Sequence, residues 1–266
     1  MLNLSGLARS TYYYYLKHPI RDKHEAVKAD IQRIHAENKG RYGYRRITSE
    51  LKNSGHTINH KTVLKLMRAL GIRGKQRKNE QYHSYRGTIG NVADNLLQRN
   101  FAAEKPFEKL TTDVTQFKVG DEKVYLSPVM DLFNREIISY SISRSPNLEQ
   151  IREMLSGLFE KLPENATPLF HSDQGWQYQH AEYQRLLNEH HIIQSMSRKG
   201  NCMDNGAMEN FFGRLKVEMF YGETFESVDS FICELERYID YYNNKRISTK
   251  LNGMSPVQFR THSISS

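Results

Sequence analysis

The stretch KLTTDVTQFKVGDEKVYLSPVM, residues 109–130, contains two runs in which apolar and polar residues alternate, separated by Gly120 and Asp121. Alternation with a period of two predicts strands that bury one face. Residues 109–119 and 123–130 are therefore expected to pair as a hairpin around the Gly-Asp turn. Residues 136–143 alternate in the same way and predict a third strand.

The pattern then changes to alternating helix and strand. Ser145-Pro146 is expected to cap a helix whose apolar residues continue at helical spacing as far as Leu162, and the short apolar run 168–171 predicts a fourth strand. A helix over 180–190 then leads to a fifth strand over 192–196. A three-strand meander followed by alternating helices and strands predicts an α/β, ribonuclease-H-like fold.

Three carboxylates stand out in this arrangement, and we call them the acidic triad: Asp113, Asp173 and Glu209. Asp113 lies within the first strand and Asp173 follows the fourth, although Asp is depleted in strands and a buried carboxylate needs a partner or a metal. Glu209 lies early in a helix that follows a glycine-containing loop, in SMSRKGNCMDNGAMENFFGRLKVEMF, residues 195–220. A lone Glu on a helix is usually solvated. Three converging carboxylates would instead suit a pair of Mg²⁺ ions.

The sequences around the acidic triad resemble a known signature. TTDVTQF, HSDQG and SRKGNCMDNGAMENFFGRLK together resemble the catalytic motifs of insertion-sequence transposases of the retroviral-integrase superfamily, and more narrowly the second-reading-frame product of the IS-three family. The resemblance extends from the basic front end to YYNNKRISTKLNGMSPVQF. It implies a DDE catalytic core in which the triad binds two Mg²⁺ ions, with Mn²⁺ as a substitute. The implied activity is polynucleotidyl transfer, which comprises strand cleavage and strand transfer at the ends of the element.

The resemblance also implies partners. These are double-stranded DNA, at both the element ends and the target, further copies of the chain on DNA, and an upstream reading-frame product that is joined by frameshifting. Lys216 lies seven residues after Glu209, which places it on the same helix face, roughly 10 Å further along the axis. Family members carry a basic residue at this place, so we expect Lys216 to contact DNA and use Arg214, on another side, as the comparison.

Positive charge is concentrated in the first hundred residues. They carry 20 Lys and Arg against 7 Asp and Glu, a net charge of +13, whereas residues 101–266 carry 18 against 23, a net of −5. This imbalance favours a nucleic-acid-binding front half, and solvated surface lysines are the alternative. Residues 44–71 predict a helix-turn-helix with Gly55 at the turn and Asn59 as an N-cap. Its predicted DNA-contacting side chains are Arg41, Arg45, Arg46, Lys61, Lys65 and Arg68.

The predicted organisation has four parts: a helical DNA-binding region over 1–75, a basic linker over 76–103, an integrase-type catalytic core over 104–222 and a helical extension over 223–266. An ordinary helical hairpin would show the same apolar periodicity as the helix-turn-helix. The four tyrosines at 12–15 are expected to pack a short helix against the residues after it rather than to stack on bases. In the extension, Lys245, Arg246 and Lys250 are either DNA contacts or surface charges.

Other interpretations of the site remain open. Asp131, at the end of the second strand, is the rival catalytic carboxylate, and His171 either orients a metal-bound water or is simply packed. The alternative function is a DNA-binding regulator of transposition with a vestigial catalytic site, and a free-standing nuclease is a third. The two cysteines lack the paired spacing of a zinc knuckle or a disulfide framework. Without a membrane-length apolar run, we expect a cytosolic protein that acts on the nucleoid.

Overall fold

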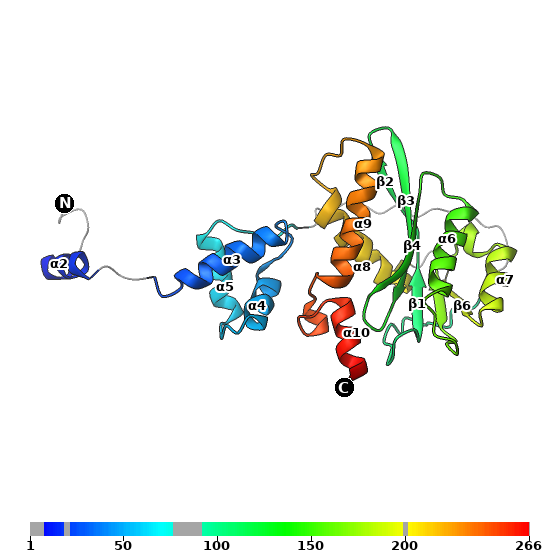
Figure 1. Cartoon of the computed structure of the whole chain (residues 1–266), viewed down its shortest axis with the longest axis horizontal. Helices are drawn as coiled ribbons and strands as arrows, with labels where there is room; N and C mark the ends of the chain where they lie inside the picture. Colours follow the sequence, from blue (N-terminus) through cyan, green and yellow to red (C-terminus); the bar gives the residue numbers. More distant parts are fainter. Residues whose placement is uncertain (1–7, 19–21, 77–91, 199–201, 266) are drawn as a thin grey trace. The chain divides into compact units, whose positions relative to one another are not determined.

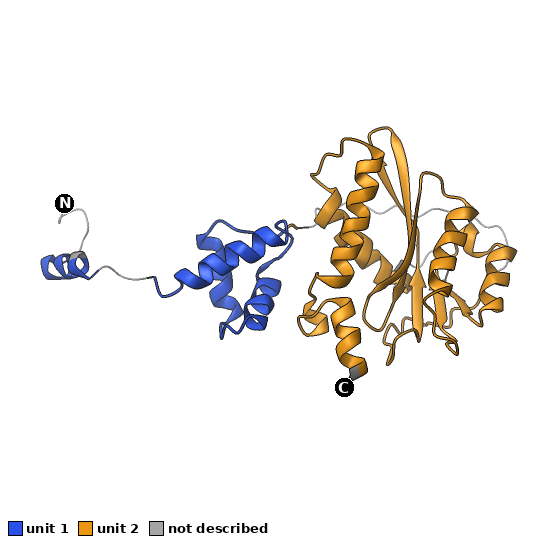
Figure 2. Cartoon of the chain, viewed as in Figure 1, with its two compact units in different colours: residues 1–74 blue, residues 75–266 orange. Residues whose placement is uncertain are grey.

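The computed structural model describes residues 8–18, 22–76, 92–198 and 202–265 (Figure 1). The chain forms two compact units, residues 1–74 and 75–266 (Figure 2). Residues 77–91 of the predicted linker and residues 199–201 of the glycine-containing loop lie outside the described residues. In the described part of the chain, no helix has the length and apolar character needed to cross a membrane.

The first unit is helical. Its elements are α2 (Arg9–Lys17), α3 (Glu25–Glu37), α4 (Tyr44–Asn53) and α5 (His60–Ala69). Gly55 ends the turn after α4 with φ +89°, a conformation that glycine adopts without strain. Asn59 caps α5, because its side chain accepts a hydrogen bond from the Lys61 backbone N–H at 2.8 Å. The predicted pair of helices and its cap are therefore confirmed.

Side chains of α3, α4 and α5, together with Tyr42 from the loop before α4, form the core of this unit. The fully or almost fully buried side chains are Ile31, Ile34, Tyr42, Ile47, Leu51, Val63, Leu66 and Met67. The tyrosines of α2 behave differently, since Tyr13, Tyr14 and Tyr15 are between 42% and 59% exposed. The expectation that they pack against the residues after them is therefore wrong. Consecutive residues of a helix point to different sides, so four adjacent tyrosines cannot all face one core.

The second unit is built on a mixed sheet. Its strands are β1 (Lys109–Thr112), β2 (Thr115–Val119), β3 (Glu122–Asp131), β4 (Ile137–Ser143), β5 (Leu169–Ser172) and β6 (Ile193–Met196). β3 pairs antiparallel with β1, β2 and β4, whereas β1–β5 and β5–β6 are parallel. β1 and β2 keep one register against β3, because Thr112 lies opposite Val129 and Thr115 opposite Leu126. β1 and β2 together therefore correspond to the single strand predicted over 109–119, with an interruption between them.

The interruption falls at Asp113 and Val114. Carried through the gap, the register sets Asp113 opposite Pro128, which has no N–H and offers the neighbouring strands only its carbonyl. With β1 and β2 counted as one strand, the sheet order is β4, β3, β1, β5, β6. This meander followed by two parallel crossovers is the predicted ribonuclease-H-like arrangement.

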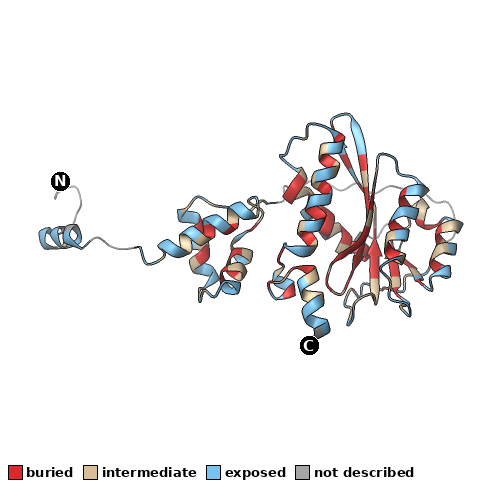
Figure 3. Cartoon of the chain, viewed as in Figure 1, coloured by how far each residue is buried: buried red, intermediate tan, exposed pale blue. Residues whose placement is uncertain are grey.

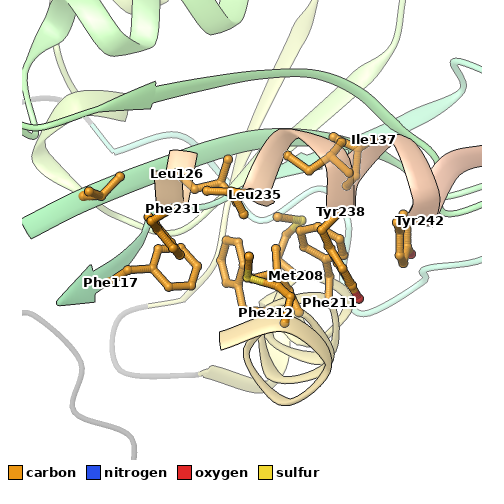
Figure 4. Close-up of a cluster of buried hydrophobic side chains, with 14 of the residues drawn as sticks. Phe117, Leu126, Ile137, Met208, Phe211, Phe212, Phe231, Leu235, Tyr238 and Tyr242 are labelled. Atoms are coloured by element: carbon orange, nitrogen blue, oxygen red, sulfur yellow. The ribbon is translucent and has the colours of Figure 1, made fainter. Parts of the chain in front are cut away.

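Helices cover both faces of the sheet (Figures 1 and 3). On one face α6 (Leu148–Phe159) and α7 (Ala181–Glu189) enclose a core with β1, β3 and β5. On the other, α8 (Gly206–Leu215) and α9 (Val228–Asn244) pack against the sheet, with Phe211 and Leu235 among the shared side chains (Figure 4). The remaining elements are α10 (Pro256–Ser265) and short helices at Trp176–Tyr178, Cys202–Asn205 and Thr249–Leu251.

The helix that carries Glu209 changes type at its end. α8 passes at Leu215 into a π-helix, η3 (Lys216–Phe220), in which the Tyr221 N–H donates to the Lys216 carbonyl five residues back. Glu218 of this segment is buried and forms a bidentate ion pair with Arg246, at 2.8 and 2.7 Å. Arg246 is 2% exposed, so its expected role at the surface or on DNA is wrong. The desolvated guanidinium is stabilised by the Glu218 carboxylate and stacks on Tyr242.

Candidate active site

Two members of the acidic triad follow neighbouring parallel strands. Asp113 comes directly after β1 and Asp173 directly after β5. Thr111 lies opposite His171 in this pairing, so the same register carried two residues further sets Asp113 beside Asp173. Both side chains are partly exposed. Strand pairing alone therefore brings together two carboxylates that are 60 residues apart in the chain.

Local backbone geometry holds each of these two carboxylates. Asp113 Oδ1 accepts a hydrogen bond from the Val114 N–H at 2.7 Å, and Asp173 Oδ1 accepts one from the Gly175 N–H at 2.9 Å. A Cβ at Gly175 would lie 2.9 Å from Asp173 Oδ1 and 2.6 Å from the Gln177 amide nitrogen. Only glycine therefore fits at this position without moving the carboxylate.

The third carboxylate is placed by a helix that is anchored to β1. Glu209 lies in the first turn of α8, and Asn205 immediately precedes this helix. The Asn205 side chain accepts from Thr111 Oγ1 at 2.7 Å and donates to the Thr112 carbonyl at 3.2 Å. These bonds fix the start of α8 against the end of β1. Reasoning from sequence quoted Asn205 within a motif but gave it no role, because its partners lie more than 90 residues away.

The charges of the other two carboxylates act on Asp113. The pKa of Asp113 is raised well above its ordinary value, chiefly by burial and then by the neighbouring Asp173 charge, with Glu209 contributing further. Burial also raises the pKa of Asp173. Like charges that disfavour each other in this way are the usual signature of a cation site or of a shared proton. Among the described residues, however, no three His, Cys, Asp or Glu side chains are gathered into a ready-made metal centre.

Comparisons with known proteins agree with this architecture. Residues 103–202 match a family model described as an integrase core domain, residues 209–264 match a second integrase core model, and residues 21–80 match an HTH-like domain. The chain is 49% identical over 261 residues to a putative transposase for insertion sequence element IS150 from Escherichia coli, covering 98% of this chain and 92% of the relative. This chain belongs to the IS3 family of insertion-sequence transposases.

Further relatives support the assignment. An uncharacterized transposase-like protein of Haemophilus influenzae is 55% identical over 207 residues, which cover 78% of this transposase and 95% of the relative. The transposase for insertion sequence IS3A of Escherichia coli is 35% identical over 228 residues, which cover 85% of this chain and 79% of the relative. These matches confirm the family, the integrase-type fold and the helix-turn-helix-like region that the sequence predicts.

Asp131 and His171 occupy other positions in the transposase fold. Asp131 pairs with Leu110, near the opposite end of β1 from Asp113. It is fully buried, and its two oxygens accept hydrogen bonds from the Phe107 and Phe133 N–H groups at 2.8 Å each. Burial raises its pKa to about 6. Asp131 therefore joins the segment before β1 to the turn after β3, away from Asp113.

His171 is buried in β5, two residues before Asp173. Its Nδ1 lies 2.9 Å from Ser195 Oγ, and burial lowers its pKa to about 4. The Ser195 oxygen already accepts the N–H groups of Leu96 and Leu97, so its hydroxyl proton is donated to Nδ1. His171 is thus a neutral, packed histidine with its proton on Nε2.

The basic residues that the sequence singled out differ in exposure. In the first unit, Arg45, Lys61, Lys65 and Arg68 are exposed, whereas Arg41 is half-buried and Arg46 stacks over the Tyr42 ring at 5.3 Å. In the second unit, Lys216 is half-buried with its Nζ 5.4 Å from the Phe117 ring centroid, and Arg214 is exposed. The chain is α-helical without interruption from Glu209 to Leu215, so Lys216 lies on the same helix face as Glu209, as predicted.

Proposed function

We propose that this transposase cleaves and joins DNA strands at the ends of an insertion sequence, and that the acidic triad holds the two Mg²⁺ ions this chemistry uses. The observation that carries the proposal is the β1–β5 register, which sets Asp113 beside Asp173 while Asn205 ties the Glu209 helix to β1. Carboxylate oxygens are the donors that Mg²⁺ prefers. The Asp113 carboxylate, whose pKa is raised by burial and by the Asp173 and Glu209 charges, fits beside a dication pair. Mn²⁺ has the same ligand preference.

Bound metal would activate the attacking oxygen and stabilise charge on the leaving oxygen during in-line displacement at phosphorus. The chain's own contribution is to hold three carboxylates at one edge of the sheet and to leave them partly exposed, so that a DNA backbone can reach them. Lys216, on the Glu209 helix face, is suited to a phosphate beside the scissile one. Such a reaction needs no covalent protein intermediate.

DNA recognition is proposed for the first unit. Four of its exposed basic side chains lie on the two helices of the helix-turn-helix-like pair, where they can contact phosphates and enter a groove (Arg45, Lys61, Lys65, Arg68). Further copies of the chain on DNA and an upstream reading-frame product are the remaining proposed partners.

The test is to replace each triad residue with its amide and to follow excision of a plasmid-borne element. Asp113→Asn, Asp173→Asn and Glu209→Gln should each abolish cleavage and transfer while DNA binding by the full chain stays unchanged. Asp121→Asn, in the exposed β2–β3 turn, is the control. Normal Mg²⁺-dependent activity in any triad variant would remove that residue from the site. Binding without activity in the parent chain would favour the regulator.

A further inference from the structure

The segment Val92 to Asn100 is docked on the edge strand of the catalytic sheet. The Met196 N–H at the end of β6 donates to the Asp94 carbonyl at 3.2 Å, and Leu97 is 2% exposed. The backbone N–H groups of Leu96 and Leu97 both donate to Ser195 Oγ, at 3.0 and 3.3 Å. This docking covers the free side of β6 with chain that precedes the sheet.

Asp204 joins this docked segment to Arg198, at the start of the glycine-containing loop. Its carboxylate is 1% exposed and accepts hydrogen bonds from Asn95 Nδ2 at 3.0 Å and Arg99 Nε at 2.8 Å. On the loop side, it accepts the Arg198 backbone N–H and Nε, both at 3.1 Å, and Nη2 at 3.2 Å. The Arg198 side chain, with Arg99, holds the pKa of Asp204 well below its usual range. One buried carboxylate thus binds three separate positions of the chain.

This junction is linked directly to the acidic triad. Asp204 is followed by Asn205, whose side chain holds the start of α8 against β1, and Glu209 lies one turn further along α8. A rigid helix transmits a displacement at its first residue to the residue one turn away. The second connection runs through Ser195 to His171, which lies two residues before Asp173 on β5.

We propose that Asp204 is a positioning residue that couples docking of the segment Val92 to Asn100 to the placement of Glu209 beside the two aspartates. This inference rests on the proposed function, because the quantity that is coupled is metal binding by the acidic triad. Coupling is reciprocal, so metal binding also favours the docked segment. The segment that precedes the core therefore takes part in assembling the active site.

The experiment is a Mn²⁺ titration of the full chain, monitored by fluorescence of Trp176, the only tryptophan in the sequence. Trp176 lies three residues after Asp173, so their Cα atoms are at most about 11 Å apart. Asp204→Asn removes the charge, and Arg99→Ala removes only one of the two contacts from the docked segment. Glu136→Gln is the matched control, since Glu136 is also buried and binds Arg260 through both oxygens, at 2.7 and 3.2 Å.

We expect the Mn²⁺ concentration at half-saturation (the midpoint) to rise about tenfold in Asp204→Asn, a value at the lower end of typical coupling between sites. The rise in Arg99→Ala should be smaller, about threefold, because this variant keeps the other hydrogen bonds to Asp204. Exchange of the Leu96 and Leu97 amide hydrogens should accelerate in both variants. Glu136→Gln should change neither the midpoint nor the exchange rates. If Asp204→Asn fails to fold, Arg99→Ala alone decides the question, because Arg99 is 41% exposed and Arg198 still pairs with Asp204.

Faster amide exchange with an unchanged Mn²⁺ midpoint would overturn the coupling and leave the proposed function standing. An equal shift in Glu136→Gln would show general destabilisation and would also overturn it. The same titration of Asp173→Asn separates the two proposals: if the parent signal survives this substitution, or no saturable signal exists, the proposed metal site fails and the coupling fails with it.

Discussion

Replacing Asp173 with Asn should stabilise the metal-free transposase while removing its response to Mg²⁺. Asp113 and Asp173 directly follow neighbouring parallel strands, and paired strands are spaced about 4.8 Å apart. Two full charges at that separation repel by about 3 kcal/mol at an effective dielectric constant near 20. Proton uptake by Asp113 relieves part of this repulsion, so we expect a gain of about 1–2 kcal/mol in the free energy of unfolding at pH 7.

The pH dependence of this gain has a definite sign. The pKa of Asp113 is raised in the folded protein, so its contribution to stability is complete below its ordinary value of 3.8 and is lost as the pH rises above it. The substitution removes one of the charges that cause this loss. The stabilisation produced by Asp173→Asn should therefore be larger at pH 8 than at pH 5.

Urea unfolding of the full chain, followed by circular dichroism in EDTA and then in Mg²⁺, measures both effects. At a Mg²⁺ concentration ten times the dissociation constant, the parent should gain about 1.4 kcal/mol, whereas Asp173→Asn should gain little. Asp121→Asn, in an exposed turn of the same unit, should behave like the parent. A variant less stable than the parent in EDTA, or an equal gain from Mg²⁺, would refute the reasoning.

Three other expectations concern separate parts of the molecule. Lys216→Ala should slow strand transfer at subsaturating DNA by the equivalent of about 1–3 kcal/mol, the value of a charge-assisted phosphate contact. Arg214→Ala should slow strand transfer by a smaller factor. Equal rates for Lys216→Ala and the parent would contradict this expectation. Residues 1–74 carry 15 Lys and Arg against 5 Asp and Glu, so this unit alone should bind duplex DNA. Its affinity, measured by fluorescence anisotropy, should fall steeply as the salt concentration rises. A flat salt dependence would exclude this unit from DNA contact. The pKa of Asp131 is raised to about 6, so the parent should lose about 2 kcal/mol of stability relative to Asp131→Asn as the pH rises from 4 to 7, measured by urea unfolding. A constant difference would mean that Asp131 does not titrate in this range.

Local pattern was enough to predict most elements of the fold. Alternation located β3 and β4 to within one residue at either end, and a side-chain cap at Asn59 marked the start of α5. The first predicted strand is interrupted at Asp113, a feature that depends on Pro128 in the partner strand and so is not visible in the strand's own sequence. The composition and alternation of a segment can predict that it forms a strand, whereas the place where the strand is interrupted depends on the strand that pairs with it.

The side-chain contacts that organise the site were beyond sequence reasoning for the same reason. Arg246 looked like a surface or DNA-contacting charge, because nothing near it in sequence shows that Glu218 would accept it 28 residues away. Asp204 and Asn205 looked only like residues before a helix. Their partners, such as Arg99 and Thr111, come from segments about a hundred residues earlier. Spacing and motif identified which acids to consider, and the geometry that holds them had to come from the fold.

The π-helical turn at Lys216–Phe220 bears on how family members are aligned. A π turn holds one more residue than an α turn, so this segment can gain or lose a single residue without changing the helix before it. An alignment gap after Glu209 is therefore best placed within 217–220. Placed earlier, the gap would break the seven-residue interval between Glu209 and Lys216 and would match the lysine with a residue from the wrong side of the helix.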